Sequence, residues 1–154
     1  QCVIHTHTAA GCAVAAQKDG LLPLSQQSLF PLVGQVAYHD YEGVALHEQE
    51  KPRLVADLGS SNYYILRNHG LLTCGESVAH AFLNMYLLES ACAIQLRAQS
   101  AGAELIPLPQ VAIDNTVAEY KAMAEQGSSA FDVAGLAWEA VKRRVDRHNP
   151  GYAS

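Results

Sequence analysis

The 154-residue chain has the composition of a globular protein, with 49% hydrophobic and 16% charged residues. Ten Lys and Arg against 15 Asp and Glu give a formal net charge of −5, which argues against a surface that attracts nucleic acid or anionic lipid. No stretch approaches the roughly 20 apolar residues of a membrane span, and the four scattered cysteines predict reduced thiols. We therefore expect a single cytoplasmic domain over residues 1–154, with no nucleic-acid or membrane partner.

The sequence opens on an apolar run. Cys2, Val3 and Ile4 directly follow Gln1, a pattern that is typical of a buried strand. Because processed termini usually leave an exposed tail, we expect a further segment of the domain to precede Gln1.

Hydrophobic spacing, caps and breakers predict alternating strands and helices over the first half of the chain. Strands are expected at residues 2–7, 35–38, 63–67 and 71–74, and the last two meet at a hairpin or bulge around Asn68-His69-Gly70. Helices are expected at residues 9–18 after the cap residue Thr8, within 25–32, and at 48–58.

The longest predicted helix begins after Ser77 and ends near Ala101. Its apolar residues recur at steps of three and four, which predicts a stripe that faces a sheet or another subunit. The stripe comprises Val78, Ala81, Phe82, Met85, Leu88, Cys92 and Leu96. The polar face is expected to carry Glu76, His80, Asn84 and Arg97. Glu89 falls inside the stripe, where we interpret it as a structural ion pair or interface contact. Two further helices are predicted at residues 112–126 and 132–147, separated by Gly127-Ser128-Ser129.

His5 and His7 are two residues apart, a spacing that places both imidazoles on one face of a strand. Neutral imidazoles bind zinc, and catalytic zinc usually has three protein ligands. His69 is the best third candidate, because it follows a predicted strand and precedes Gly70, where the backbone can approach closely. The pattern leaves open the alternative that these are hydrogen-bonded polar side chains on a half-exposed strand.

The remaining candidate residues are interpreted as structural. Solvent-exposed imidazoles are expected at His39, His47, His80 and His148. Packed side chains without a chemical role are expected at Cys12, Cys74, Tyr38, Tyr41, Tyr63 and Tyr64.

Four motifs follow one another in a characteristic order over about residues 1–110. They are Val3-Ile4-His5-Thr6-His7-Thr8, Tyr38-His39-Asp40-Tyr41-Glu42-Gly43, Leu66-Arg67-Asn68-His69-Gly70-Leu71 and Gly75-Glu76-Ser77-Val78. In this order they resemble the class II aldolase/adducin family. The resemblance implies an α/β fold, a three-layer α/β/α sandwich around a mostly antiparallel sheet, in homo-oligomers that include cyclic tetramers. It also implies that His5, His7 and His69 bind a divalent metal, zinc in the catalytic members.

The same resemblance leaves the catalytic residues unknown. Family enzymes take their acid/base glutamate and their phosphate-binding loops from a segment before the His-x-His strand, which here would precede Gln1. A tyrosine that some family aldolases use as a proton donor has no counterpart in Leu22-Pro23-Leu24-Ser25-Gln26-Gln27. We therefore expect residues 1–154 alone to bind metal but to turn over substrate poorly.

Two hypotheses of function follow. The first is zinc-dependent aldol cleavage or epimerisation of a small keto-sugar phosphate, in which the metal stabilises negative charge on substrate oxygens. The second is a non-catalytic, adducin-like binding or assembly domain, which Asn68-His69-Gly70-Leu71 and Ala91-Cys92-Ala93-Ile94-Gln95-Leu96-Arg97 particularly resemble. Three retained histidines favour the enzyme.

Overall fold

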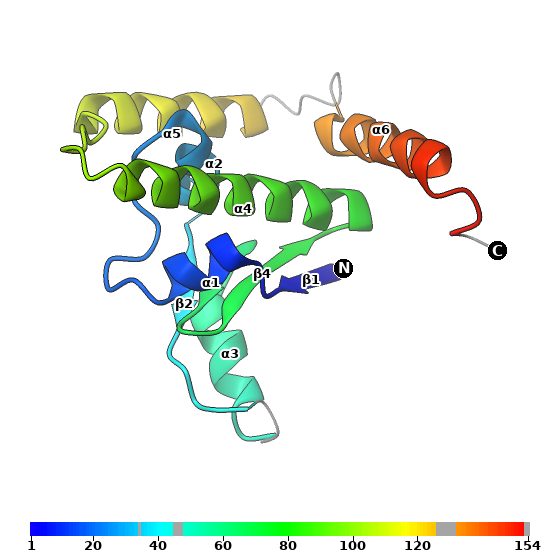
Figure 1. Cartoon of the computed structure of the whole chain (residues 1–154), viewed down its shortest axis with the longest axis horizontal. Helices are drawn as coiled ribbons and strands as arrows, with labels where there is room; N and C mark the ends of the chain where they lie inside the picture. Colours follow the sequence, from blue (N-terminus) through cyan, green and yellow to red (C-terminus); the bar gives the residue numbers. More distant parts are fainter. Residues whose placement is uncertain (34, 45–47, 126–131, 153–154) are drawn as a thin grey trace.

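A four-stranded mixed sheet forms the centre of the computed structural model, which describes residues 1–33, 35–44, 48–125 and 132–152 (Figure 1). The strands are β1 (Cys2–Thr6), β2 (Ala37–His39), β3 (Tyr63–Leu66) and β4 (Gly70–Gly75), in the order β1-β4-β3-β2. β4 is antiparallel to both β1 and β3, whereas β2 runs parallel to β3. The sheet is therefore mostly antiparallel, as expected.

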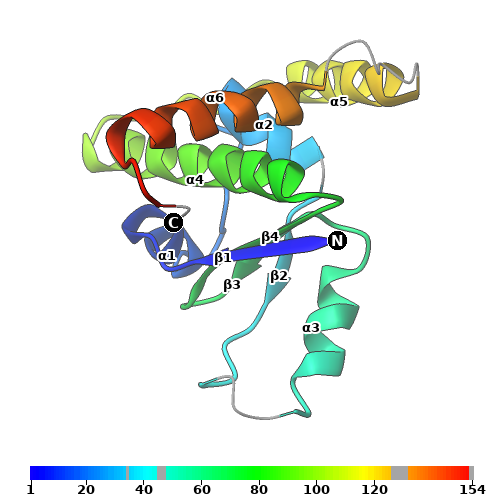
Figure 2. The ribbon, with the colours of Figure 1, turned by 90° about the vertical axis from the view of Figure 1, so that its right-hand side faces the viewer.

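Helices cover both faces of this sheet, which confirms the α/β fold (Figures 1 and 2). The helices are α1 (Ala9–Ala15), α2 (Gln26–Val33), α3 (Lys51–Leu58), α4 (Val78–Ser100), α5 (Gln110–Glu125) and α6 (Val133–His148). α1 and α4 pack on one face, and α3 packs against β2 on the other. Beyond α4, the helices α2 and α6 lie against it and α5 lies against α2.

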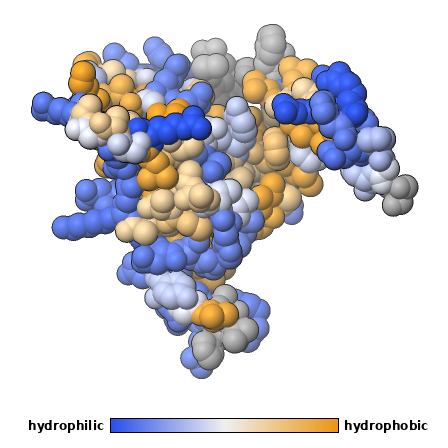
Figure 3. Space-filling model, viewed as in Figure 1, coloured by the Kyte–Doolittle hydropathy of each residue, from blue (hydrophilic) through white to orange (hydrophobic). Residues whose placement is uncertain are grey.

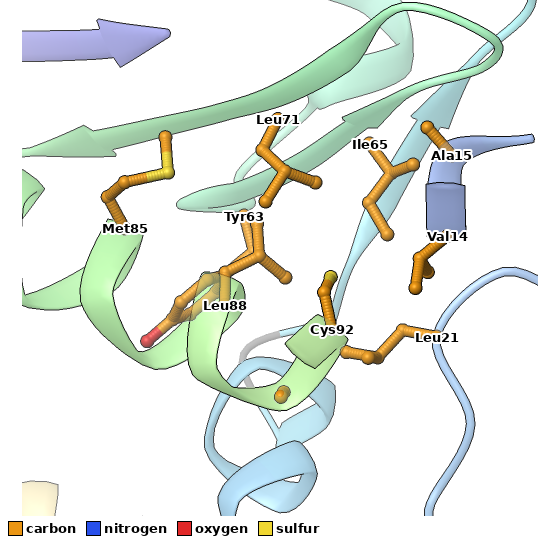
Figure 4. Close-up of a cluster of buried hydrophobic side chains, with 10 residues drawn as sticks. Val14, Ala15, Leu21, Tyr63, Ile65, Leu71, Met85, Leu88 and Cys92 are labelled. Carbon is orange, nitrogen blue, oxygen red and sulfur yellow. The ribbon is translucent and has the colours of Figure 1, made fainter. Parts of the chain in front are cut away.

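The hydrophobic core lies between the sheet and helices α1 and α4 (Figure 4). Alternation along the strands selects which side chains enter it, because successive residues of a strand point to opposite faces. The buried cluster comprises Val14, Ala15, Leu21, Tyr63, Ile65, Leu71, Met85, Leu88, Ala91 and Cys92. Ile4 of β1 packs against this cluster, so His5, its neighbour, points to the opposite face of the sheet.

The predicted elements are found, with shifted ends. α1 ends at Ala15 rather than at residue 18. The Gln17 N–H donates to the Val14 carbonyl, three residues back, so the chain has already left the α-helical pattern there. β2 begins at Ala37 and extends through His39, and α3 begins at Lys51, after a turn that residues 48–50 form. The predicted Gly127-Ser128-Ser129 break lies outside the described residues. No helix within the described part of the chain is both long and apolar enough to span a membrane.

The predicted stripe of α4 is only partly correct. Ala81, Met85, Leu88 and Cys92 are buried, but Val78 is 49% exposed. Close contact between α4 and the sheet is seen at Ala81, about one turn after Val78. At this point the helix backbone lies so near Gly75 of β4 that a Cβ on Gly75 would be 2.4 Å from the Ala81 backbone nitrogen.

Other side chains of α4 have partners that the spacing did not identify. The Phe82 ring faces Trp138 of α6, with ring centroids 5.3 Å apart, rather than the sheet. Asn84 is not on the polar face: it donates a hydrogen bond to the Cys74 carbonyl and accepts one from Tyr63 Oη. Ala81, Asn84 and Leu88 fall on one side of the helix, so Asn84 necessarily meets the sheet.

Glu89 has a neutral partner, and the structure shows no ion pair for it among the described residues, so of the two predicted roles only that of an interface contact stays a prediction. Thr8 Oγ1 donates a hydrogen bond to Glu89 Oε2 and also accepts one from the Gly11 backbone N–H, at 3.2 Å. A single threonine therefore caps α1 and connects it to α4.

The outer helices leave apolar side chains at the surface. Figure 3 shows apolar surface near the place where α4 approaches α6, beside hydrophilic side chains. Val133 and Leu136 of α6 are 57% and 60% exposed. Tyr120 of α5 is in ring contact with Phe30 of α2, at 5.1 Å between centroids.

Candidate metal centre

Two of the three predicted metal ligands come from the end of β1. His5 lies within the strand, and His7 follows its last residue, Thr6. The segment that carries His7 is held at both ends, because β1 precedes it and α1 begins directly after the cap residue Thr8. Both imidazoles are exposed on the face opposite the helical core.

The third histidine lies in the turn that joins β3 to β4. Asn68 adopts a left-handed conformation there, with φ of 56°, which asparagine tolerates better than most residues. Its backbone N–H donates to the Ala15 carbonyl at 3.1 Å, and Cys12 Sγ donates to the His69 carbonyl at 3.0 Å. α1 therefore holds the turn from one side, and His69 has a fixed position.

The three imidazoles converge, as the sequence led us to expect. One nitrogen from each of His5, His7 and His69 lies within 4.8 Å of the other two. The ring centroids are 4.6 Å apart for His5 and His7, 4.8 Å for His5 and His69, and 4.6 Å for His7 and His69. The antiparallel pairing of Thr6 with Leu71 produces this convergence, because it brings the end of β1 beside the turn before β4.

Hydrogen bonding fixes the tautomer of His5 at this centre. His5 Nδ1 lies 2.8 Å from the Leu71 carbonyl oxygen, and a carbonyl only accepts, so Nδ1 carries a proton. His5 Nε2 therefore accepts a hydrogen bond from His7 Nε2, at 2.8 Å. Burial, together with the neighbouring His5 and His7, lowers the pKa of His69 below its usual 6.5. A lowered pKa favours the neutral imidazole, which is the form that binds metal.

The chemistry of this donor set fits a divalent transition metal. Three neutral imidazoles are a common ligand set of catalytic zinc, which keeps a further position open for water or substrate. A cleft of about 570 Å³ opens beside the histidines. Its lining comprises His5, His7, Cys12, Tyr41, Gly43, Val44, Asn68 and His69.

Tyr41 is not the packed side chain that was predicted. It is 55% exposed, and its ring centroid lies 6.4 Å from that of His69. Tyr63 and Tyr64, by contrast, are buried as predicted, and burial raises the pKa of each to about 12.

His39 is the clearest error among the secondary candidates. It was predicted to be solvated but is 5% exposed, because β2 extends through it and places its side chain between Leu66 of β3 and helix α3. Its Nδ1 lies 2.7 Å from Asp57 Oδ2. Residues 39 and 57 are too far apart in the sequence for a helix or strand repeat to predict their contact. The pair of His39 and Asp57 forms because α3 packs against β2. His80 and His148 are exposed as predicted, and His47 lies outside the described residues.

The cysteines are free thiols, as expected. Cys92 is buried in the core, where desolvation raises the pKa of its thiol to about 12. Cys74 is half-buried, and its pKa is also raised by burial. Cys12 contributes a hydrogen bond to the turn that carries His69, so it helps to position that turn.

Comparison with known proteins identifies the class to which this fold and this histidine cluster belong. Residues 1–96 match the family model described as the class II aldolase and adducin N-terminal domain. A Pseudomonas aeruginosa protein whose name places it among the class 2 aldolases is 54% identical over 99% of this chain. The chain belongs to the class II aldolase and adducin family.

Relatives within this family carry different names. Rat alpha-adducin is 42% identical over 99% of this chain, which covers 21% of that protein. An aldolase II superfamily protein from Pseudomonas syringae is similar in structure, with a TM-score of 0.87 and 48% identity over 99% of this chain and 59% of that one. An L-fuculose 1-phosphate aldolase from Glaciozyma antarctica gives a TM-score of 0.62 at 28% identity, over 76% of this chain and 43% of that one. The chain spans 58% of the length of the Pseudomonas aeruginosa relative.

Proposed function

We propose that this chain carries the metal centre of a zinc-dependent enzyme that cleaves or epimerises a small keto-sugar phosphate. The observation that carries the proposal is the convergence of three imidazoles, from the end of β1 and from the turn between β3 and β4, beside an open cleft. His5, His7 and His69 are the proposed ligands. The similarity to an L-fuculose 1-phosphate aldolase supports a sugar phosphate as the substrate class. A homo-oligomer, a tetramer in the simplest case, and a cytoplasmic location belong to the same proposal.

A zinc ion bound there would supply a Lewis acid that stabilises negative charge as it develops on a substrate oxygen. The chain's own residues hold the three imidazoles in position. The Leu71 carbonyl orients the ring of His5 by accepting from Nδ1, an outer-shell contact of the kind that usually tunes metal ligands. The hydrogen bond from Cys12 fixes the backbone of His69.

The described residues that line the cleft include no Asp or Glu, so we assign no general base to them. Tyr41 is the exposed cleft residue with a titratable hydroxyl, and it is placed to contact a bound substrate.

A second candidate function is that of a non-catalytic, adducin-like binding or assembly domain. The 42% identity with rat alpha-adducin over nearly the whole chain favours it. The two candidates differ in whether bound metal leads to turnover.

Zinc binding and turnover should be measured on the same full-length preparations. We expect isothermal titration calorimetry to show zinc binding that His69→Ala weakens at least 100-fold. His148→Ala is the matched control, since His148 is exposed and hydrogen-bonds to the Arg144 carbonyl within α6. L-fuculose 1-phosphate and ribulose 5-phosphate should then be assayed with zinc supplied. Zinc-dependent turnover that His69→Ala abolishes supports the enzyme, whereas tight zinc binding without turnover of either substrate favours the adducin-like domain.

A further inference from the structure

A second polar cluster lies beside the metal centre, under helix α3. It consists of His39, Glu42, Glu50, Arg53 and Asp57, and we call it the His39 cluster. His39 Nδ1 lies 2.7 Å from Asp57 Oδ2. An ionised carboxylate can only accept, so Nδ1 donates, and Nε2 of a neutral ring then holds a lone pair.

Nε2 of His39 points at negative charge. This atom is buried and has no hydrogen-bond partner among the described residues. Glu50 Oε1 lies 3.6 Å away and Glu42 Oε1 lies 3.7 Å away, both too far for a direct hydrogen bond. A buried lone pair that faces two anionic oxygens is unfavourable unless a positive charge lies between them.

The cluster has too few positive charges of its own. Arg53 binds both carboxylate oxygens of Glu42 through Nε and Nη2. Glu50 is 9% exposed, and among the residues that the structure describes His39 is its one basic neighbour within 4.0 Å. Three carboxylates, from Glu42, Glu50 and Asp57, therefore share one guanidinium. A neutral His39 leaves Glu50, the buried member of the three, without a positive partner within 4.0 Å among the described residues, and a divalent cation would supply that charge.

A cavity lies beside the His39 cluster, and the His39 residue forms part of its wall. Its volume is about 50 Å³, and its walls include His39, Glu42, Glu50 and His69. One water needs roughly 10–15 Å³ of such space, so the cavity has room for an ion with water ligands. Arg67 also lines it, but that guanidinium donates to the Gln17 carbonyl and lies over the Tyr38 ring, 4.3 Å from the centroid.

We propose that the His39 cluster binds a divalent transition-metal cation, with His39 Nε2 and Glu50 Oε1 as its protein ligands and water in the other positions. Two ligands at about 2.0–2.2 Å from one ion lie some 3–4 Å apart, and these two atoms are 3.6 Å apart. Asp57 accepts from Nδ1 and so orients the ring, as carboxylates commonly do behind metal-bound histidines. Imidazole with carboxylate suits zinc and manganese. Its ligands differ from those of the three-histidine centre, whose His69 borders the same cavity, and the proposal does not depend on the proposed function.

Chelator-treated full-length protein should be titrated with zinc and, separately, with manganese. We expect two cations per chain, counted by calorimetry and by elemental analysis after gel filtration. Glu50→Gln should reduce the count to one, and Asp57→Asn should weaken the second site about 10–100-fold. His5→Ala/His7→Ala should remove the other cation and leave this one. Glu48→Gln is the matched control, because Glu48 is an exposed carboxylate paired with Lys51. Unchanged circular dichroism and melting temperature show that each variant has folded.

Two results would overturn the proposal. The first is a single cation per chain that the His5→Ala/His7→Ala variant abolishes. The second is two cations that persist in both Glu50→Gln and Asp57→Asn. If the count is one, nitrogen NMR of His39 identifies the alternative: protons on both ring nitrogens mean that an imidazolium, and not a metal, balances the charge of Glu50 and the neighbouring carboxylates. Loss of the His39 site leaves the test of the three-histidine centre intact, since the variants act on different ligands.

Discussion

A Cβ atom on Gly70 would lie 2.4 Å from the Thr6 carbonyl oxygen and 3.1 Å from His7 Cδ2. The turn that carries His69 and the strand that carries His5 therefore touch through a residue that has no side chain. The three imidazoles can approach one another because β1 and the start of β4 lie this close.

Gly70→Ala tests this relationship. The added methyl group would push the backbone of Thr6 away, and overpacking of this kind costs about 1–3 kcal/mol of unfolding free energy. We expect urea denaturation to show that loss and calorimetry to show at least a tenfold loss of zinc affinity. His69→Ala, which leaves the strand contact unchanged, should lower the affinity with a much smaller effect on stability. If Gly70→Ala leaves the zinc affinity unchanged, the close contact between Gly70 and Thr6 is not needed to bring the three histidines together.

Acid should weaken both metal binding and the metal-free fold. The pKa of His69 is lowered in the folded protein, so below about pH 6.5 the unfolded chain binds more protons at this residue than the folded chain does. The free energy of unfolding therefore decreases as the pH falls from about 6.5 towards the lowered pKa of His69. Thermal melts of the metal-free protein between pH 5 and 8 measure this loss, and in His69→Ala the slope should become shallower.

Thr8 connects α1 to α4 through one hydroxyl, and its loss should be measurable. Thr8→Ala removes the cap of α1 and the hydrogen bond to Glu89, and we expect a destabilisation of about 1–2 kcal/mol in urea unfolding. Thr8→Ser keeps the hydroxyl and should retain most of the stability. Equal stability of the alanine and serine variants would show that the hydroxyl does not stabilise the junction of α1 and α4.

Cys92 should be chemically inert in the folded protein. Its side chain is buried and the pKa of its thiol is raised to about 12, so almost no thiolate exists near neutral pH. Iodoacetamide at pH 8, followed by mass spectrometry, should leave Cys92 unmodified until a denaturant is added. Cys2 is partly exposed and serves as the internal control, since it should react first.

Local patterns in the sequence were sufficient to predict most of the elements and the first two histidines of the cluster. Period-two spacing places His5 and His7 on one face of a strand whatever the rest of the chain does. Thr8, Ser77 and Asp132 are helix caps that can be recognised from their own neighbours. His69 could be predicted as a third candidate, because a glycine follows it at the end of an apolar run.

Tertiary structure decided which of these residues meet. The pairing of β1 with β4 joins residues more than 60 positions apart, and no local preference encodes that pairing. The same reason explains the errors at His39 and Asn84. Their partners, Asp57 on α3 and the Cys74 carbonyl on β4, come from elements whose packing depends on the whole core. A residue's own propensity fixes its backbone conformation to a first approximation, whereas its burial and its partners depend on where distant segments are placed.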